Sequence, residues 1–227
     1  MTGRGRVAAE PLEAGVAGVA PGALPAAFYQ RPSIEVARDL LGCLLTDGTV
    51  TVRLVETEAY AGLSDPASHS FRGKTPRNAI MWGPPGKLYV YFTYGMHWCM
   101  NAVCGGDGEP SAVLLRAGEV VAGGDVAQAR RPGVRDRDLG RGPARLARLL
   151  AINGEDNGVD LTAGRGPLTV QPGDRVPDGQ VRTGPRVGLN PRMGEAADWP
   201  WRYWIDGSPA VSPFRPGGLR ARKPPLA

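Results

Sequence analysis

The chain has 227 residues, enough for one domain of ordinary size with a substantial hydrophobic core. Its 27 lysines and arginines exceed its 22 aspartates and glutamates, so the net charge is +5 and the pI is near 9.4. This mild basicity is compatible with a nucleic-acid partner but does not establish one. The three cysteines and two histidines lack the spacing of a zinc site, so no metal centre or other cofactor is expected.

The composition divides the chain into a central domain and two tails. Residues 1–27 are rich in Ala, Gly and Pro and are predicted to be disordered, and residues 216–227 form a short, basic, flexible tail. We expect residues 28–215 to form a single folded domain. No stretch is apolar enough to span a membrane, and the N-terminus lacks the apolar core of a signal peptide. We therefore expect an intracellular monomer of the cytoplasm or nucleoid, with no membrane partner.

Turn residues and hydrophobic patterns predict short elements along the central domain. A helix is predicted over residues 32–41, with Ser33 as its N-cap. Further helices are predicted over residues 120–130 and 143–152, the latter with Pro143 in its first turn. Because strands outnumber helices and connections are short, we predict one α+β domain: a curved, mostly antiparallel sheet with flanking helices and a protruding β-hairpin. The strands are predicted at 43–46, 50–60, 87–94, 97–104, 111–117, 167–171, 185–189 and 202–206.

Two carboxylates lie at the end of a strand-like run in the segment VRLVETEAY. Strict alternation places Val52 and Leu54 on the same side of the strand as Glu56, Glu58 and Tyr60, and the two apolar residues mark that side as the inner one. A carboxylate that follows them inward must be paired, hydrogen-bonded or functional, because burying a lone charge is costly. An ion pair with one of the many arginines is the structural explanation, and a catalytic carboxylate is the functional one.

An aromatic cluster follows in the segment KLYVYFTYGMHWCMN. Alternation places Tyr89, Tyr91 and Thr93 on one strand face, and residues 94–96 are predicted to form the tip of a hairpin. A large aromatic residue at an exposed tip is poorly suited to a plain soluble protein, but it is useful if the tip enters a gap between stacked bases. The alternative is that Tyr94 folds back onto the sheet.

A long segment at residues 65–86, with few signals of regular structure, joins these two runs. Loops of this length in compact domains are usually functional or disordered. The segment contains His69 followed by three cations, Arg72, Lys74 and Arg77. A histidine in a basic loop close to an inward glutamate favours a functional site here.

A second group of cations accompanies the helix predicted over residues 143–152. Arg141, Arg145 and Arg148 recur at helical spacing, opposite a face of leucines. Either a solvated helix face or contacts with a DNA backbone explain this pattern equally well.

Segments spread over residues 28–214 resemble, in family order, the alkyladenine (3-methyladenine) DNA glycosylase family of monofunctional base-excision repair enzymes. The resemblance implies a single-domain mixed fold with an antiparallel sheet. It also implies excision of alkylated or deaminated purines, such as 3-methyladenine, 7-methylguanine, hypoxanthine and ethenoadenine, from double-stranded DNA. The matching segments are ARDLLG (37–42), VETEAY (55–60), the loop from Asp65 to His69, TPRN (75–78), GKLYVYFTYGMHWCMN (86–101), AVLLRAGE (112–119), GPARL (142–146) and GSPAVS (207–212).

The resemblance implies a catalytic role for two residues and base binding for several others. Glu58 is similar to the general base that activates water for attack at the sugar C1′, and Arg116 to the cation near that water. Tyr60 and Tyr91 resemble the two rings that sandwich a base flipped out of the duplex, and His69 resembles the residue at its edge.

The remaining implied roles concern selectivity and DNA contact. Asn101 resembles the pocket residue that obstructs the exocyclic amino group of guanine, and Tyr94 resembles the residue that fills the vacated base stack. His97 departs from members that carry a bulky aromatic residue there, which puts the grip of the hairpin on DNA in doubt. The candidate contacts with the DNA backbone are Arg72, Lys74, Arg77, Arg141 and Arg145.

A non-catalytic nucleic-acid-binding module of the same fold is the alternative to an enzyme. Such a module needs a basic groove but has no need for an inward Glu58 beside His69 and two tyrosines, so the full set favours an enzyme. Lys87 is the one lysine within the matching catalytic runs, and hydrolysis needs none. A lyase step through a Schiff base is therefore disfavoured.

Overall fold

An eight-stranded sheet forms the centre of the computed structural model, which describes residues 22–93 and 95–218. The strands are β1 (Leu44–Thr46), β2 (Thr51–Tyr60), β3 (Leu88–Thr93), β4 (His97–Cys104), β5 (Ser111–Ala122), β6 (Thr169–Gln171), β7 (Val181–Gly184) and β8 (Arg202–Ile205). The main order is β3-β4-β5-β2-β1-β6, and β8 pairs with both β2 and β7. The pairings between these strands are all antiparallel, which confirms the predicted α+β fold around an antiparallel sheet.

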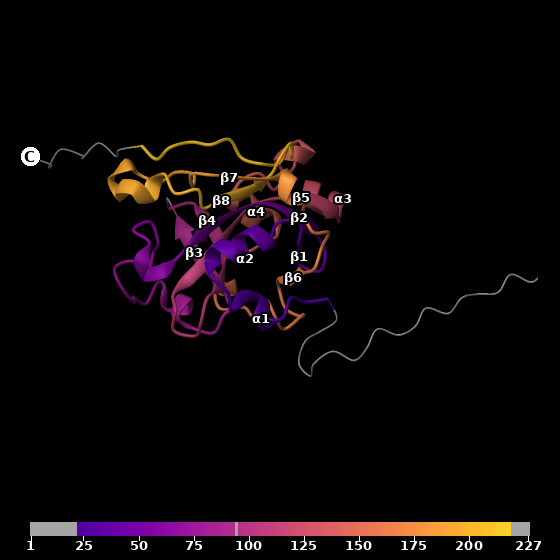
Figure 1. The fold of residues 1–227 in the computed structure, drawn as a ribbon. Helices are drawn as coiled ribbons and strands as arrows, with labels where there is room; N and C mark the ends of the chain where they lie inside the picture. The colour runs from indigo at the N-terminus through magenta and orange to yellow at the C-terminus, as the bar shows by residue number, and fades with distance from the viewer. Residues whose placement is uncertain (1–21, 94, 219–227) are drawn as a thin grey trace, which may run out of the picture.

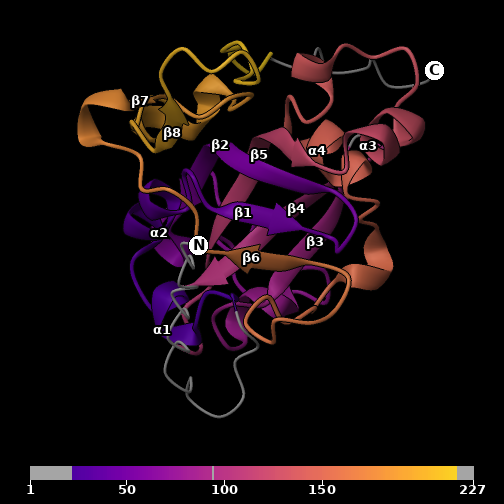
Figure 2. The same cartoon turned by 90° about the vertical axis from the view of Figure 1, so that its right-hand side faces the viewer.

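Short helices flank this sheet at two places (Figures 1 and 2). The α-helices are α1 (Ala26–Tyr29), α2 (Ser33–Asp39), α3 (Gly124–Arg130) and α4 (Pro143–Leu149). In Figure 2, α1 and α2 lie at the left of the sheet, and α3 and α4 lie at its upper right. Within the described residues, no helix has the length and apolar character needed to cross a membrane. The 3₁₀ helices are η1 (Gly62–Ser64), η2 (Ala79–Trp82), η3 (Asp136–Asp138), η4 (Gly154–Asp156), η5 (Asp178–Gln180) and η6 (Pro191–Ala197).

The main core includes one face of the sheet together with α2 and α4. Val36 and Ala37 of α2 and Leu146 and Leu149 of α4 are fully buried in it. Thr57 of β2 adds a polar link, because its Oγ1 donates to the carbonyl of Ala37 at 2.7 Å. Burying one such leucine contributes about 1.5–3 kcal/mol. Helices this short are therefore held by packing rather than by their own hydrogen bonds.

The side chains of strand β2 do not alternate regularly between the two faces of the sheet. Its pairing with β5 shifts register on both sides of Glu56. Val52 and Leu54, before the register shift, belong to the main core. Ala59, after the shift, belongs to it as well. The side chains that face the core are therefore even-numbered before the shift and odd-numbered after it. The expectation that Glu58 faces the same side as Val52 and Leu54 is thus wrong. A β-bulge re-aims the strand, as bulges beside functional sites commonly do.

Two predicted helices have different starting points in the structure. The helix predicted over residues 32–41 is confined to α2, where Pro32 occupies the N-cap position and Ser33 makes no capping hydrogen bond. The N-cap assignment to Ser33 is therefore wrong. The helix predicted from residue 120 begins only at Gly124, because β5 continues to Ala122 in order to pair with the full length of β2.

The strand predicted at residues 185–189 does not form. Strand β7 ends one residue before Pro185, which has no N–H to donate to a sheet. The next N–H groups are used elsewhere: Val187 donates to the carboxylate of Glu58 at 2.6 Å. This segment is therefore irregular because its backbone serves a side chain of β2.

Differences also occur at the N-terminal domain boundary and at the end of α4. Leu24, which the sequence assigned to the tail, is buried, and its N–H donates to the carbonyl of Val170 at 2.9 Å. The predicted helix over 143–152 ends at Leu149, because Ala151 adopts a left-handed conformation with φ of 55°. The greater parts of the two predicted tails, residues 1–21 and 219–227, lie outside the described residues.

Candidate active site

A cavity of about 370 Å³ lies beside β2, β3, β4 and β5, and its wall also includes residues 67–69 and 187–189, Met81 of η2, and Pro143 and Ala144 of α4. Small-molecule sites typically have volumes of about 300–1,000 Å³. The structure brings together around this cavity all six residues predicted to act in catalysis or in the base pocket, whereas Tyr94 lies outside the described residues. Those that line it are Glu58, Tyr60, His69, Tyr91, Asn101 and Arg116.

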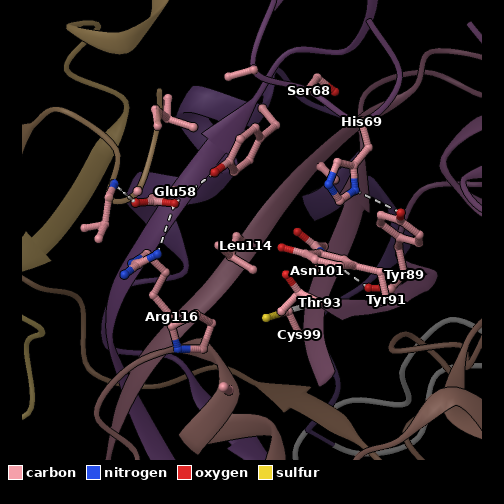
Figure 3. A pocket seen from close by; sticks show the side chains of 18 of the residues that line it. Glu58, Ser68, His69, Tyr89, Tyr91, Thr93, Cys99, Asn101, Leu114 and Arg116 are labelled. Carbon is pink, nitrogen blue, oxygen red and sulfur yellow. Dashed lines mark hydrogen bonds and ion pairs between the residues drawn. The ribbon is translucent and has the colours of Figure 1, made fainter. Parts of the chain in front are cut away.

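The lining residues form two groups on opposite sides (Figure 3). Glu58 and Arg116 lie on one side, and an aromatic group with His69, Tyr89 and Tyr91 lies on the other. Leu114 of β5 lies between the two groups and contributes an apolar surface. A ligand in the cavity would thus meet the aromatic group on one side and, on the other, the carboxylate of Glu58 together with the ring of Tyr60 that is hydrogen-bonded to it.

Glu58 is fully buried and is held by three donors from different parts of the chain. Its Oε1 accepts from the Val187 N–H at 2.6 Å, and its Oε2 accepts from the Tyr60 hydroxyl at 3.0 Å. Arg116 Nη1 lies 3.3 Å from the same Oε2. Burial and the adjoining Glu58 raise the pKa of Tyr60 well above its ordinary value, so this hydroxyl acts as a donor.

Arg116 also joins Glu58 to Glu56, the other carboxylate of the strand. Its Nε donates to Glu56 Oε1 at 3.0 Å, and Arg202 Nε donates to the same atom at 2.7 Å. Burial alone would raise the pKa of Glu56, but Arg116, Arg202 and the N–H of Ser212 hold it below its ordinary value. Burial likewise acts to lower the pKa of Arg116, yet the two glutamates outweigh it and raise it. Glu56 and Arg116 therefore both stay charged.

The aromatic side of the cavity consists of residues of β3 and of the loop that precedes it. The His69 ring lies 4.5 Å from the Tyr91 ring, centroid to centroid, in an edge-on arrangement. Its Nδ1 is 3.0 Å from the hydroxyl of Tyr89. Although His69 is an exposed residue, desolvation of its imidazole and the charge of Arg77 lower its pKa to about 4. The imidazole is therefore neutral at physiological pH.

Asn101 and Cys99 of β4 line the floor beside these rings. Asn101 Nδ2 donates to the carbonyl of Tyr89, its partner across the strands, at 3.1 Å. Burial raises the pKa of the Cys99 thiol, which makes it a poor nucleophile. Cys43, Cys99 and Cys104 are all free and buried. Within residues 22–93 and 95–218, no cluster of His, Cys, Asp and Glu could hold a metal ion.

Arg186 is the most important residue of the site region that the sequence did not indicate. It is almost completely buried, and its guanidinium makes a two-point ion pair with Asp65 at 2.5 and 2.9 Å. The same group lies over the Tyr60 ring, 4.7 Å from its centroid. Arg186 does not line the cavity, so it supports Tyr60 from behind. In a chain this rich in arginine, the sequence gives no signal that distinguishes it.

The cations predicted to contact DNA lie outside the cavity wall. Arg72, Lys74 and Arg77 are exposed on the loop between β2 and β3. The segment 65–86 is less irregular than predicted, since it contains η2 near its end, while η1 directly precedes it. Arg77 reaches back to the hairpin, where its guanidinium lies 5.5 Å from the centroid of the Tyr91 ring.

Arg141 and Arg145 lie on the other side of the cavity and share a partner. Arg141 Nη1 is 3.3 Å and Arg145 Nη1 is 3.9 Å from Asp138 Oδ1. Arg141 precedes α4 and also donates to the carbonyl of Val211 at 3.0 Å. It is therefore partly a structural residue, while Arg145 is exposed.

We expect His69 to titrate far below an ordinary histidine. The unfolded chain binds this proton with a pKa near 6.5. The contribution of neutral His69 to stability is therefore present above that pH and is lost as the pH falls toward about 4. Imidazole NMR shifts followed against pH, with His69→Gln used for assignment, should place the midpoint well below 6. A midpoint at or above 6.5 would contradict the desolvated environment.

We also expect the Arg186–Asp65 pair to be critical for stability. Arg186→Met leaves a buried carboxylate without its partner, which should lower the free energy of unfolding by about 3–5 kcal/mol. The matched control is Arg182→Met, because its pair with Asp206 is about half exposed on both sides (49% and 51%). That change should cost less than about 1 kcal/mol in urea unfolding. Equal losses of unfolding free energy in the two variants would show that the Arg186–Asp65 pair is not critical for stability.

Comparisons with known proteins identify the family of the chain. The family described as Methylpurine-DNA glycosylase (MPG) matches residues 27–209. A protein of Streptomyces avermitilis named "Putative 3-methyladenine DNA glycosylase" is 50% identical over 202 residues, covering 86% of this chain and 93% of that protein. Proteins of the same name from Frankia casuarinae (51% identical; 83% and 92% covered) and Burkholderia cenocepacia (50%; 85% and 92%) are similar. The predicted resemblance is confirmed: the chain belongs to the methylpurine-DNA glycosylase family and is a DNA glycosylase, a hydrolase of N-glycosyl bonds.

Proposed function

We propose that this glycosylase flips alkylated or deaminated purines out of duplex DNA and hydrolyses their glycosidic bond with a water activated by Glu58. The observation that carries the proposal is the placement of the Glu58–Arg116 pair opposite an aromatic group across one cavity. A base held by the rings would direct its sugar toward the carboxylate. 3-Methyladenine, 7-methylguanine, hypoxanthine and ethenoadenine are the proposed substrates.

Tyr60 and Tyr91 are proposed to stack on the two faces of the flipped base. Both line the cavity, one from β2 and the other from β3. Stacking on an aromatic side chain contributes roughly 1–3 kcal/mol per base, which offsets a flipping cost of a few kcal/mol. A cationic alkylated purine gains further from electron-rich rings. Damaged bases are also paired less stably in the duplex, so they are extruded at lower cost.

The neutral state of His69 supports a role in reading the edge of the base. Burial raises the pKa of Tyr89, and the nearby charge of Arg77 opposes that rise. A cation beside the Tyr89 oxygen attracts its lone pairs and leaves the hydroxyl proton for His69 Nδ1. Neutral His69 then carries its own proton on Nε2. It would donate to a base edge that carries an acceptor, such as hypoxanthine O6.

Glu58 is proposed as the general base and Arg116 as its electrostatic partner. As the water oxygen bonds to C1′, its proton passes to Glu58 and the glycosidic electron pair leaves with the base nitrogen. The donors to Glu58 come from Val187, Tyr60 and Arg116, so the carboxylate needs little reorganisation before the reaction. An alkylated purine is already a good leaving group, so one carboxylate suffices.

A monofunctional mechanism is proposed because the lysines of the described region lie outside the cavity. Lys87 Nζ forms an ion pair with Asp160 at 3.1 Å and does not line the cavity. Lys74 is exposed on the loop and is also absent from the lining. A Schiff-base nucleophile would have to reach C1′ from within the cavity.

Binding of DNA is proposed to involve the β3–β4 hairpin and the neighbouring loop. We propose Tyr94, from its place in the sequence at the hairpin tip, as the residue that fills the vacated stack. Phe92 and Met96 on either side are exposed (46% and 67%), which makes the tip apolar. The backbone contacts are proposed to come from Arg72 and Lys74, together with Arg77, Arg141 and Arg145.

The first test is substitution of the proposed base. Glu58→Gln keeps the size of the side chain but cannot take a proton, so excision should fall by about 10² or more while lesion-DNA binding is kept. Single-turnover excision is measured on duplexes that each carry one lesion, followed by alkaline cleavage of abasic sites. Near-normal excision by this variant would remove Glu58 from the role.

Glu56→Gln is the matched control for this test. Glu56 accepts from Arg116, Arg202 and Ser212, so losing its charge should destabilise the fold by about 3–5 kcal/mol. Its effect on excision by the folded fraction should be smaller than that of Glu58→Gln. The two glutamates then separate into one that mainly affects chemistry and one that mainly affects folding.

The second test concerns discrimination against guanine by Asn101. Its side chain lines the cavity and is fixed by the carbonyl of Tyr89, so it cannot easily withdraw from a 2-amino group. Asn101→Ser should relax this obstruction and raise removal of undamaged guanine relative to hypoxanthine. The measured quantity is the ratio of single-turnover excision rates on matched duplexes. An unchanged ratio would make Asn101 a structural residue of the strand.

A further inference from the structure

A second concave region, a groove of about 600 Å³, adjoins the catalytic cavity. The two share Arg116 and Val187 as a common wall. The groove is formed mainly by the connection between α3 and α4 and by the chain after β8. Besides Arg116, its charged lining residues are Arg131, Arg135, Arg141, Arg145, Arg215 and Asp138.

The positive charge of this groove is incompletely neutralised. Asp138 is the sole acidic residue in its described lining. Its carboxylate lies within 4.0 Å of the guanidinium groups of Arg135, Arg137, Arg141 and Arg145. One carboxylate cannot balance four such cations, so a strong positive potential remains.

Arg131 and Arg215 add to this excess. Arg131 Nη1 donates to backbone carbonyls, one of them that of Asp138 at 2.9 Å, and not to a carboxylate. Burial and the neighbouring charges of Arg145 and Arg148 lower its pKa, the effect expected where like charges crowd. Arg215 is exposed, and no ion pair to it is found among the described residues. A bound anion would relieve this crowding.

The position of the groove indicates which anion fits. In the proposed function the base occupies the cavity and its sugar lies near Glu58, whose partner Arg116 forms the wall of the groove. A deoxyribose carries a phosphate on each side, so one of them must leave the cavity near this wall. Arginine side chains bind such oxygens through paired N–H groups.

We propose that this arginine groove binds the phosphodiester that flanks the flipped nucleotide, with Arg145 and Arg215 as its principal ligands. The proposal rests on the proposed function, in that a nucleotide enters the cavity. Arg141 stays engaged with Val211 and Asp138 and shapes the floor. The groove would thus hold the DNA strand at the reacting nucleotide, whereas Arg72, Lys74 and Arg77 would contact the DNA from the side of the β3–β4 hairpin.

The test asks whether the loss of affinity caused by removing the charge of one phosphate depends on the presence of two arginines. Duplexes carry a tetrahydrofuran abasic-site analogue, which has no glycosidic bond and cannot be cleaved. The phosphate on its 5′ or its 3′ side, or a distant phosphate of the same strand, is replaced by an uncharged methylphosphonate. Binding is measured for the full chain, for Arg145→Gln/Arg215→Gln, and for the control Arg182→Gln, which removes an exposed arginine on β7.

One of the flanking methylphosphonates should raise the Kd of the unaltered protein by about tenfold or more, as expected for a lost charge-assisted contact. In Arg145→Gln/Arg215→Gln the same methylphosphonate should have little further effect, and the slope of log Kd against log salt should fall by about 0.9 per lost phosphate contact. Arg182→Gln should keep the full methylphosphonate effect.

The proposal is overturned if neither flanking methylphosphonate weakens binding, or if its effect persists undiminished in Arg145→Gln/Arg215→Gln. Both substitutions are at exposed positions, so thermal unfolding should match that of the unaltered protein. Because the analogue cannot be excised, the result does not depend on catalysis. Excision of the individual lesions, measured separately, tests the proposed function by itself.

Discussion

The pairing of Glu56 with Arg116 and Arg202 is the interaction on which the site depends. A fully buried carboxylate is tolerated only when its charge and its lone pairs are compensated. Here two guanidinium groups and both the N–H and hydroxyl of Ser212 provide that compensation. Arg116 is thereby fixed in place before it meets Glu58. The geometry around Glu58, the proposed general base, follows from a structural ion pair two residues away.

This arrangement separates two demands that usually conflict. A reacting carboxylate must be accessible to a water and a sugar, yet a charged cluster is most stable when it is buried and fully hydrogen-bonded. Glu56 meets the second demand within the charged cluster, whereas Glu58 is equally buried but lines the cavity, and it is the carboxylate that we propose to react. The register shift around Glu56 makes the separation possible, because it redirects the strand between its core-facing half and its cavity-facing half.

Much of the fold and of the cavity wall was predictable from local patterns. The regular alternation of β3 and β4 correctly placed Tyr89, Tyr91 and Thr93 on one face, and they do line the cavity with Asn101. The burial of Glu58 was also predicted, but for a wrong reason, since alternation cannot reveal a bulge that depends on the partner strand β5. The resemblance, rather than any pattern, indicated which of the two glutamates faces the ligand.

The unpredicted part of the site consists of residues whose roles arise from distant contacts. Arg186 and Val187 lie in a stretch whose β-branched and apolar residues favour a strand. Their actual conformation is decided by Asp65, Tyr60 and Glu58, which are far away in the sequence. No window of local sequence contains both members of such a pair. The arginine-rich composition further hides Arg186 among many similar residues.

The same long-range contacts have a consequence for how the protein becomes active during synthesis. Glu58 obtains a hydrogen bond from a residue 129 positions later, and Glu56 obtains two from a residue 156 positions later. While the ribosome, at about 5–20 residues per second, has yet to release that last stretch, the nascent chain holds its carboxylates without these partners. Strands β1–β5 have been synthesised by then, but the residue that completes the hydrogen bonds of Glu56 has not. Premature termination before Ser212 leaves Glu56 without two of its hydrogen bonds, so we expect the truncated chain to lack a fully formed site.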